Sequence, residues 1–208
     1  GLDPAKMPPV LLESTDVVGS VTADKAAQLG LAHGIPIVLG GIDAAIATFA
    51  GGVRKPGDHV AMLGTSMCWG YLQTETESGR DLVCMPYVYK GLTQRYVFGG
   101  AATAGGAVTW FVEQFCQAEL AQAKQQGISV YTLLEQQAGP LPPGAHGLVF
   151  LPYLMGERSP VWDARASGTF AGLNLTHTRS HLYRAVIEGI AFALWHNMRA
   201  VGDRRHDL

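Results

Sequence analysis

The sequence is short of charged residues. Asp, Glu, Lys and Arg make up 15% of its 208 residues, against about 25% in an average soluble domain. Fifteen basic and seventeen acidic residues give a net charge of −2, and the basic residues form no block. Electrostatic binding of DNA or RNA requires clustered Lys and Arg side chains, so we expect no nucleic-acid partner.

Cysteine is scarce as well. Cys68, Cys84 and Cys116 are odd in number and widely spaced, which predicts reduced thiols in the cytoplasm and argues against a disulfide framework. His177 and His181 are four residues apart, but the sequence places no third ligand beside them. We therefore expect no metal-binding residues, and we assign both histidines structural or surface roles.

A leader and an uninterrupted apolar run of membrane-spanning length are also missing. The first six residues lack an apolar core and a starting Met, so we expect the chain to begin inside a longer protein. Residues 34–53 contain one charge, Asp43, but Pro36 and five glycines interrupt them. A lone carboxylate at the centre of a bilayer is costly, so we expect no membrane span and a cytoplasmic protein.

Glycine and short apolar runs are abundant. The 26 glycines bound apolar runs that are typical of strands, and longer segments carry apolar residues at helical spacing. Strands are expected over residues 17–21, 35–39, 60–63, 67–72, 83–88, 96–98 and 148–151, and helices over 23–29, 44–49, 104–125, 129–136 and 178–201. The strands at 35–39 and 60–63 are expected to be buried. We predict an α/β fold with a mixed sheet and packed helices, cut at both ends.

Asp43 is the first candidate for chemistry. It follows the expected strand at 35–39 and is flanked by Gly40, Gly41 and two alanines, which are too small to cover its carboxylate. An Asp at the end of a buried strand can accept a proton from an attacking hydroxyl, as phosphoryl transfer requires. The local pattern is also that of a helix N-cap, and it leaves this alternative open.

Two glycine-containing segments are candidates for anion binding. The expected strand at 60–63 runs into Gly64-Thr65-Ser66, which can present N–H groups and two hydroxyls to a phosphate. An ordinary turn is the alternative. Residues 64–68 nearly match the G-x-S-x-G nucleophile elbow of hydrolases, but Cys68 replaces its last glycine, so a hydrolase is not indicated. Residues 99–107 are small and precede a helix. Small residues at a helix start allow a nucleotide to approach the backbone, and the alternative is that they let the helix pack closely on a sheet.

The order of these segments resembles the FGGY family of carbohydrate kinases. Residues 151–160 (LPYLMGERSP) extend the resemblance. The strongest match is Gly168-x-Phe170-x-Gly172-Leu173, followed after seven residues by 181–188 (HLYRAVIE). This segment fits the family's C-terminal signature at every constrained position.

The resemblance implies a ribonuclease-H-like fold of the actin/hexokinase superfamily, in which two domains enclose a cleft where sugar and ATP meet. Residues 1–38 would be the end of the N-terminal domain, and residues 39–208 the C-terminal domain without its final adenine-binding segment. The missing N-terminal domain is then an expected partner, and the isolated chain is expected to be inactive. The apolar face that this domain would leave exposed favours association, including a homodimer.

The resemblance also implies roles for single residues. Asp43 matches the catalytic aspartate. Gly64 and Thr65, with Ser66 beside them, match the family's second phosphate motif. Gly105 matches a backbone contact to the nucleotide, and Thr109 lies where some members have a polar contact to it. Glu157 and Arg158 belong to the family's Gly-Glu-Arg segment, where we expect a structural role and an ion pair.

The implied reaction is in-line phosphoryl transfer to a sugar hydroxyl, with Asp43 as the base and with ATP and Mg²⁺ as cofactors. Residues 41–44 and 64–68 favour a ketopentose such as xylulose or ribulose as the small-molecule substrate. A kinase of glycerol, gluconate or another polyol remains an alternative, and so does a catalytically silent actin-like binding module.

Overall fold

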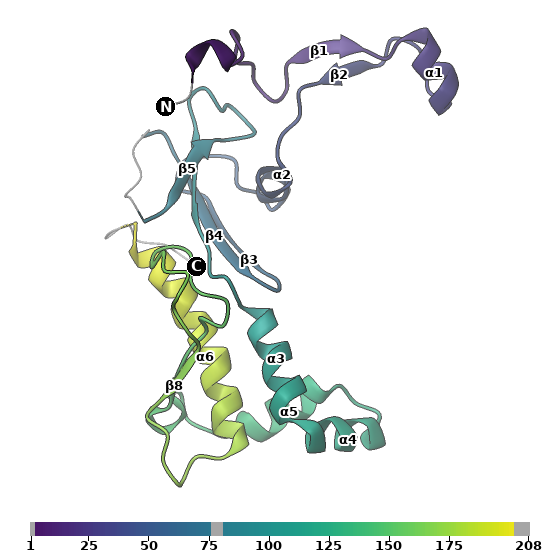
Figure 1. Cartoon of the computed structure of the whole chain (residues 1–208). Coiled ribbons are helices and arrows are strands. Elements are labelled where there is room, and N and C mark those ends of the chain that lie inside the picture. The colour runs from purple at the N-terminus through teal and green to yellow at the C-terminus, as the bar shows by residue number, and fades with distance from the viewer. Residues whose placement is uncertain (1–2, 76–80, 202–208) are drawn as a thin grey trace. The chain divides into compact units, whose positions relative to one another are not determined.

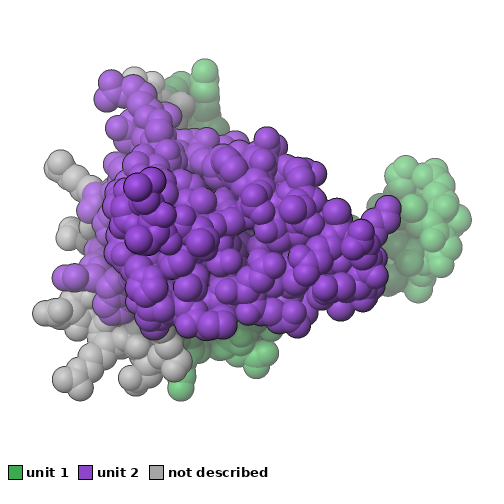
Figure 2. All heavy atoms as spheres, turned by 90° about the horizontal axis from the view of Figure 1, so that it is seen from below, with its two compact units in different colours: residues 1–60, 71–77, 84–97 green, residues 61–70, 78–83, 98–208 purple. Residues whose placement is uncertain are grey.

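The structure, a computed structural model, describes residues 3–75 and 81–201. The chain forms two compact units, which Figure 2 colours separately. The first unit contains the residues up to Val60 together with 71–77 and 84–97, and the second contains 61–70, 78–83 and the chain from Phe98 onward. Within the described ranges, every helix is too short or too polar to cross a membrane.

The first unit contains a two-stranded antiparallel ribbon, in which Val17 lies opposite Val38. A short helix between the strands has the caps that the sequence predicts: the Thr22 hydroxyl accepts a hydrogen bond from the Lys25 N–H at 3.4 Å, and Gly30 ends the helix with a φ of 67°. The elements are a 3₁₀ turn η1 (Pro4–Lys6), β1 (Val17–Ser20), α1 (Ala23–Leu29) and β2 (Pro36–Val38).

The ribbon is exposed, which corrects the prediction of a buried strand at 35–39. Ile37 and Val38 are 45% and 51% exposed, and every residue of β1 and β2 is exposed. Two strands by themselves have no second layer to cover an apolar face. The prediction of a buried strand at 60–63 is also wrong, because the residues of β3 (His59–Leu63) are half-buried or exposed.

The helix α2 (Asp43–Ala50) is anchored inside the first unit by two small buried side chains, Ala45 and Thr48. The Thr48 hydroxyl donates to the Ala44 carbonyl at 2.7 Å and lies 3.2 Å from the Tyr96 hydroxyl. These contacts fix the helix that begins with the candidate carboxylate of Asp43.

Four strands form a sheet of order β3-β4-β6-β5, and each strand contributes residues to both units. β4 is the most buried of them: Trp69 is completely buried and Tyr71 is 5% exposed. The other strands of this sheet are β4 (Met67–Gln73), β5 (Val83–Pro86) and β6 (Arg95–Gly99).

Helices and a two-stranded sheet make up most of the described part of the second unit (Figure 1). They are α3 (Gly105–Phe115), α4 (Gln117–Gln126), α5 (Val130–Ala138), a 3₁₀ turn η2 (Ala145–Gly147), β7 (Val149–Leu151), β8 (Thr169–Ala171) and α6 (Arg179–Arg199). The helix α6 contacts β7, α3 and α5. The core between these elements contains Phe111, Leu134, Leu148, Phe150, Tyr183 and Val186. The α/β class is as predicted.

Two features of the second unit differ from the prediction. The helix expected over 104–125 is two helices, because Cys116 leaves the helical conformation with φ −115° and ψ 39°. Cys116 is completely buried, and the redirected α4 lays Glu119 against Arg179 of α6 at 2.6 Å. The strand β8 is not predicted at all, because three residues between glycines give too short a pattern. It pairs with β7 through Phe170, which lies opposite Phe150.

Candidate functional site

The turn between β3 and β4 is in direct backbone contact with the start of α3. The Gly105 N–H donates to the Gly64 carbonyl at 2.9 Å, and the N–H groups of Ala104 and Gly106 donate to the Thr65 carbonyl at 2.8 and 3.0 Å. A Cβ atom at Gly105 would lie 2.7 Å from the Gly64 oxygen, so the approach requires glycine. The structure therefore brings together three of the residues predicted from the sequence.

The hydroxyl groups at this turn are open to solvent. Thr65 and Ser66 are exposed, and neither hydroxyl has a hydrogen-bond partner within the described ranges. Thr109 is exposed as well, and it lies one helical turn beyond Gly105 on the same face of α3. This surface offers hydroxyl donors beside a helix start that carries no side chains, which is the chemistry that a phosphate group needs.

The amides at the start of α3 are already in use. Gly105 and Gly106 donate to carbonyls of the turn, and Ala107 donates to Ala104 at 2.9 Å. The first N–H groups of this helix are therefore not free to bind an anion in the usual way. Gly105 can serve a nucleotide through its missing side chain, and the polar contacts would come from the turn.

Asp43 lies in the first unit, whereas the other predicted site residues lie in the second. It is exposed and occupies the first position of α2, and its Oδ1 accepts from the Ala44 N–H at 2.7 Å. Ile42 is the N-cap and no side chain caps the helix, so the alternative that Asp43 acts as the cap is wrong. A carboxylate in the first turn is still favoured by the helix dipole.

The segment leading to Asp43 is held by backbone bonds. The Gly40 N–H donates to the Ser14 carbonyl at 2.9 Å, and the Leu39 N–H donates to the Asp16 carbonyl at 3.1 Å. A Cβ atom at Gly41 would lie 2.5 Å from a methyl group of Val88. A glycine at position 41 is thus required for packing, in addition to leaving the carboxylate uncovered.

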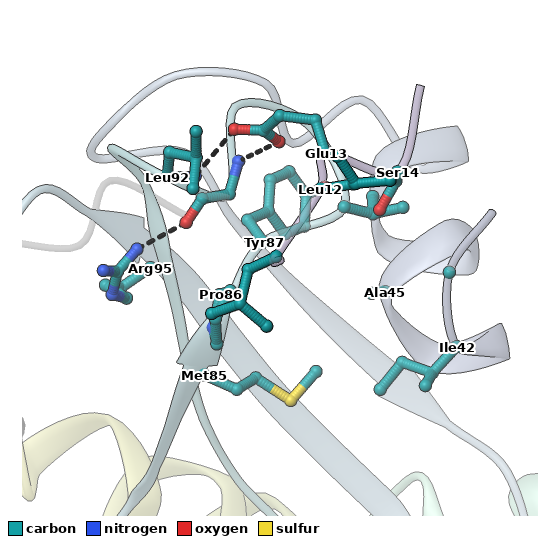
Figure 3. A pocket seen from close by; sticks show the side chains of 14 residues that line it. Leu12, Glu13, Ser14, Ile42, Ala45, Met85, Pro86, Tyr87, Leu92 and Arg95 are labelled. Atoms are coloured by element: carbon teal, nitrogen blue, oxygen red, sulfur yellow. Dashed lines mark hydrogen bonds between the residues drawn. The ribbon is translucent and has the colours of Figure 1, made fainter. Parts of the chain in front are cut away.

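A pocket of about 450 Å³ borders α2 within the first unit (Figure 3). Its walls are mostly apolar, and its two charged side chains bind backbone groups. The Glu13 carboxylate accepts from the N–H groups of Gly91 and Leu92, both at 2.8 Å, and Arg95 donates to the Gly91 carbonyl at 2.5 Å. The wall toward α2 is formed by Ile42 and Ala45, with Gly41 beside them.

The ion pair expected between Glu157 and Arg158 is absent from the described residues. The Glu157 carboxylate instead accepts from the N–H groups of Ala102 at 2.9 Å and of Arg158 at 2.7 Å. The Arg158 side chain donates to the Ala101 carbonyl at 3.0 Å. Burial raises the pKa of Glu157 above its ordinary value, and the two backbone N–H groups oppose this rise. The sequence analysis included Ala101 and Ala102 in the candidate segment at 99–107, but it did not predict their bonds to Glu157 and Arg158, because small apolar residues carry no sign that their backbone is bound.

The two predicted structural histidines belong to a cluster with a third one, His146. Its Nδ1 lies 3.0 Å from Nε2 of His181, and the rings of His177 and His181 are 5.4 Å apart between centroids. His181 also takes part in a capping box with Thr178 at the start of α6. Burial, and next the neighbouring histidines, lower the pKa of His181. No group of three His, Cys, Asp or Glu side chains in the described chain could hold a metal ion.

Comparisons with known proteins identify the family. The profile of the FGGY family of carbohydrate kinases, C-terminal domain, matches residues 59–208. The gluconokinase of Bacillus subtilis is 30% identical over 191 residues, which are 89% of this chain and 36% of that protein. The xylulose kinase of the same organism is 32% identical over 188 residues, which are 89% of this chain and 35% of that protein.

A solved structure is similar over nearly the whole chain. The xylulose kinase from Rhodospirillum rubrum matches with a TM-score of 0.83 at 33% identity, and the match covers 99% of this chain and 39% of that one. The chain thus spans well under half the length of each of these relatives.

Proposed function

The chain belongs to the FGGY family of carbohydrate kinases, and from that premise we propose that the protein carrying it transfers the γ-phosphoryl group of ATP to a hydroxyl of a sugar. The observation that carries the proposal is the backbone contact between the Gly64-Thr65 turn and the glycine start of α3. It leaves two exposed hydroxyls, those of Thr65 and Ser66, beside a surface without side chains.

The domain assignment follows from the same premise. Residues 1–38 are the end of an N-terminal domain, and residues 39–208 belong to the C-terminal domain. The profile of the C-terminal domain, which matches residues 59–208, supports the second part of this assignment, and the greater length of the relatives leaves room for an N-terminal domain. The N-terminal domain is then the partner that completes the enzyme.

Asp43 acts as the general base. Its carboxylate is exposed, stands at the first position of α2, and has one hydrogen bond, from the adjacent Ala44 N–H. It therefore retains acceptor capacity for the hydroxyl of the sugar, which must lose its proton as it attacks the phosphorus atom.

The turn at 64–66 binds the phosphates of the nucleotide. The hydroxyls of Thr65 and Ser66 donate to phosphate oxygens, and charge-assisted bonds of this kind are about twice as strong as neutral ones. Gly105 lets the nucleotide approach the backbone, and Thr109 offers a further hydroxyl one turn along α3. In-line transfer needs positioning and electrostatic stabilisation more than covalent chemistry, and this turn supplies both.

Mg²⁺ fits this arrangement as a companion of the nucleotide. It is commonly bound through phosphate oxygens, waters and one or two carboxylates, and the exposed oxygens of Thr65 and Ser66 are of the type that it accepts. When bound, it would neutralise negative charge on the phosphates.

A ketopentose such as xylulose or ribulose is the proposed substrate. The solved structure described above is a xylulose kinase by its title, and it aligns with 99% of the chain. Gluconate is the second candidate, because the gluconokinase of Bacillus subtilis aligns with 89% of the chain, as much as the xylulose kinase of that organism does.

A coupled assay of ADP release by the complete protein tests the proposal. Xylulose, ribulose, gluconate and glycerol are compared at saturating Mg²⁺-ATP. We expect ADP release that depends on xylulose or ribulose. Release that depends only on gluconate or glycerol would show that the substrate is not a ketopentose. ATP binding without any sugar-dependent release would indicate the silent binding module instead.

A further inference from the structure

The loop at residues 152–159 is bonded to four successive residues that lead into α3. Each of residues 100–103 makes one hydrogen bond with this loop, and all the atoms involved lie in the second unit. The bonds are Gly100 N–H to the Ser159 hydroxyl at 2.7 Å, Arg158 guanidinium to the Ala101 carbonyl at 3.0 Å, Ala102 N–H to the Glu157 carboxylate at 2.9 Å, and Thr103 hydroxyl to the Pro152 carbonyl.

The segment that this loop holds is the one that places the start of α3. Ala101 accepts from the Met67 N–H at 3.2 Å, and the next residue after the segment, Ala104, donates to Thr65. Met67, Ala101 and Ala104 pack together in one buried cluster. A shift of residues 100–103 would therefore move both the turn at Thr65 and the helix start at Gly105, since packed cores transmit displacement.

Glu157 is the centre of this arrangement. Its side chain carries a formal charge, yet the residue is only 5% exposed. One carboxylate oxygen, Oε1, accepts two backbone N–H groups, and the other, Oε2, is buried without a hydrogen-bond partner among the described residues. Burying a carboxylate with an unpartnered oxygen is costly, so a neutral side chain that keeps an acceptor for the two N–H groups would serve stability alone at least as well.

We propose that Glu157 is a positioning residue for nucleotide binding: by fixing the Ala102 N–H it sets residues 100–103, and through them the contact between Thr65 and Gly105. This inference rests on the proposed function, because it concerns the same phosphate-binding turn. Glu157 itself touches no reacting atom. Its effect reaches the nucleotide through the backbone of the segment that it holds.

The test compares Glu157→Ala with Glu157→Gln in the complete protein. Glutamine keeps an acceptor oxygen for the two N–H groups and removes the charge. Glu157→Ala is expected to raise KM for ATP about tenfold or more, since misplacement by about 1 Å can cost far more. Glu157→Gln should stay within about threefold of the wild-type KM, and neither variant should change KM for the sugar by more than that.

Glu119 provides a matched control. It is also a buried carboxylate of the second unit with one unpartnered oxygen, and its partner is Arg179 on α6. Glu119→Ala should lower the melting temperature without changing KM for ATP. If Glu157→Ala affects KM for ATP no more than Glu119→Ala does, Glu157 is a stability residue and the inference is wrong.

A second variant covers the case in which Glu157→Ala fails to fold. Ser159→Ala removes one acceptor from the same loop without changing charge, and a rise of about threefold in KM for ATP is expected from one lost hydrogen bond. No rise in Ser159→Ala would then overturn the inference, as would a loss of activity in Glu157→Gln equal to that in Glu157→Ala. A wild-type protein without sugar-dependent ADP release would instead defeat the proposed function.

Discussion

Leu11, Val17 and Leu39 in the first unit are 78%, 64% and 52% exposed, whereas Phe111 and Val186 in the second unit are completely buried. The second unit also exposes apolar side chains, among them Phe192 and Trp195 of α6, but these surround a closed core. The first unit buries side chains as well, among them Tyr87, Tyr96 and Val97, so the contrast lies in residues 10–12 and in the ribbon with its adjoining residues. The first unit presents apolar surface of the kind that another domain covers.

The candidate site divides along the same line. The turn at Thr65 and the start of α3 are bonded to each other and packed within the second unit. Asp43 depends on the first unit, where the neighbouring strand β2 is exposed. We therefore expect the nucleotide half of the site to depend mainly on this chain, and the half that serves the sugar to depend on the proposed N-terminal domain.

The largest expected effect is complete loss of turnover when the 208-residue chain acts alone. A positioned cleft supplies most of the effective concentration of donor and acceptor, and part of a cleft cannot align them. Coupled ADP release by the isolated chain should show no dependence on any of the four sugars, while the complete protein shows it. Sugar-dependent turnover by the chain alone would show that the proposed division of the active site between this chain and an N-terminal domain is wrong.

A pair of truncations compares the buried core of the second unit with the exposed ribbon of the first. Phe111→Ala should lower the free energy of unfolding by about 3–5 kcal/mol, because it opens a cavity in a closed core. Val38→Ala, at an exposed position of β2, should cost less than about 0.5 kcal/mol in the isolated chain. Urea denaturation measures both. A cost of Val38→Ala as large as that of Phe111→Ala would contradict the contrast between the units.

Thr65 gives the next largest effect. Thr65→Val keeps the shape of the side chain and removes the hydroxyl, so transition-state binding should weaken by about 1.5–3 kcal/mol. The readout is kcat/KM for ATP in the complete protein. Thr132→Val, at an exposed position of α5, should leave it unchanged. If both variants behave alike, Thr65 is a turn residue only.

The smallest effect concerns acid stability of the second unit. Burial and the two neighbouring histidines lower the pKa of His181, so the folded chain binds this proton less readily than the unfolded chain. Stability should be full above the ordinary histidine pKa of about 6.5 and should fall as the pH drops below it. Urea midpoints between about pH 7.5 and 5.5 measure this fall. The decrease in stability over this pH range should be smaller in His181→Gln than in the wild type. An equal decrease in the variant would exclude His181 as the cause.

Local patterns predicted much of this fold. The caps of α1 follow from Thr22 and Gly30, and the Ser129 hydroxyl, a typical N-cap, accepts from the Tyr131 N–H at the start of α5. Such features depend on neighbours in sequence. The exposure of β2 and the break at Cys116 depend on what packs against them, and nothing in the local sequence records that.

The candidate site was predictable to a similar degree. Gly64, Thr65 and Gly105 could be named from motif and resemblance, and their mutual contact is a finding of the structure. The bond between Glu157 and the Ala102 N–H could not be predicted, because Ala102 lies 55 residues away and its side chain has no polar atom. His146 escaped notice for a related reason, since it lies 35 residues before His181.

The most direct test of the central claim is a comparison of Asp43→Asn with wild type in the complete protein. Asparagine keeps the size of the side chain and an acceptor for the Ala44 N–H, but it cannot take a proton from the sugar. Asp24→Asn is the matched control, because Asp24 is an exposed carboxylate in the first turn of α1.

If Asp43 is the base, its variant should lose at least about 100-fold in kcat, the usual minimum for removal of such a group. KM for ATP should stay within about threefold of wild type, because a base acts on the transition state and not on the bound nucleotide. The control should keep full activity. An Asp43→Asn enzyme that retains more than about a tenth of the wild-type kcat would contradict the role of Asp43, since loss of a general base costs far more.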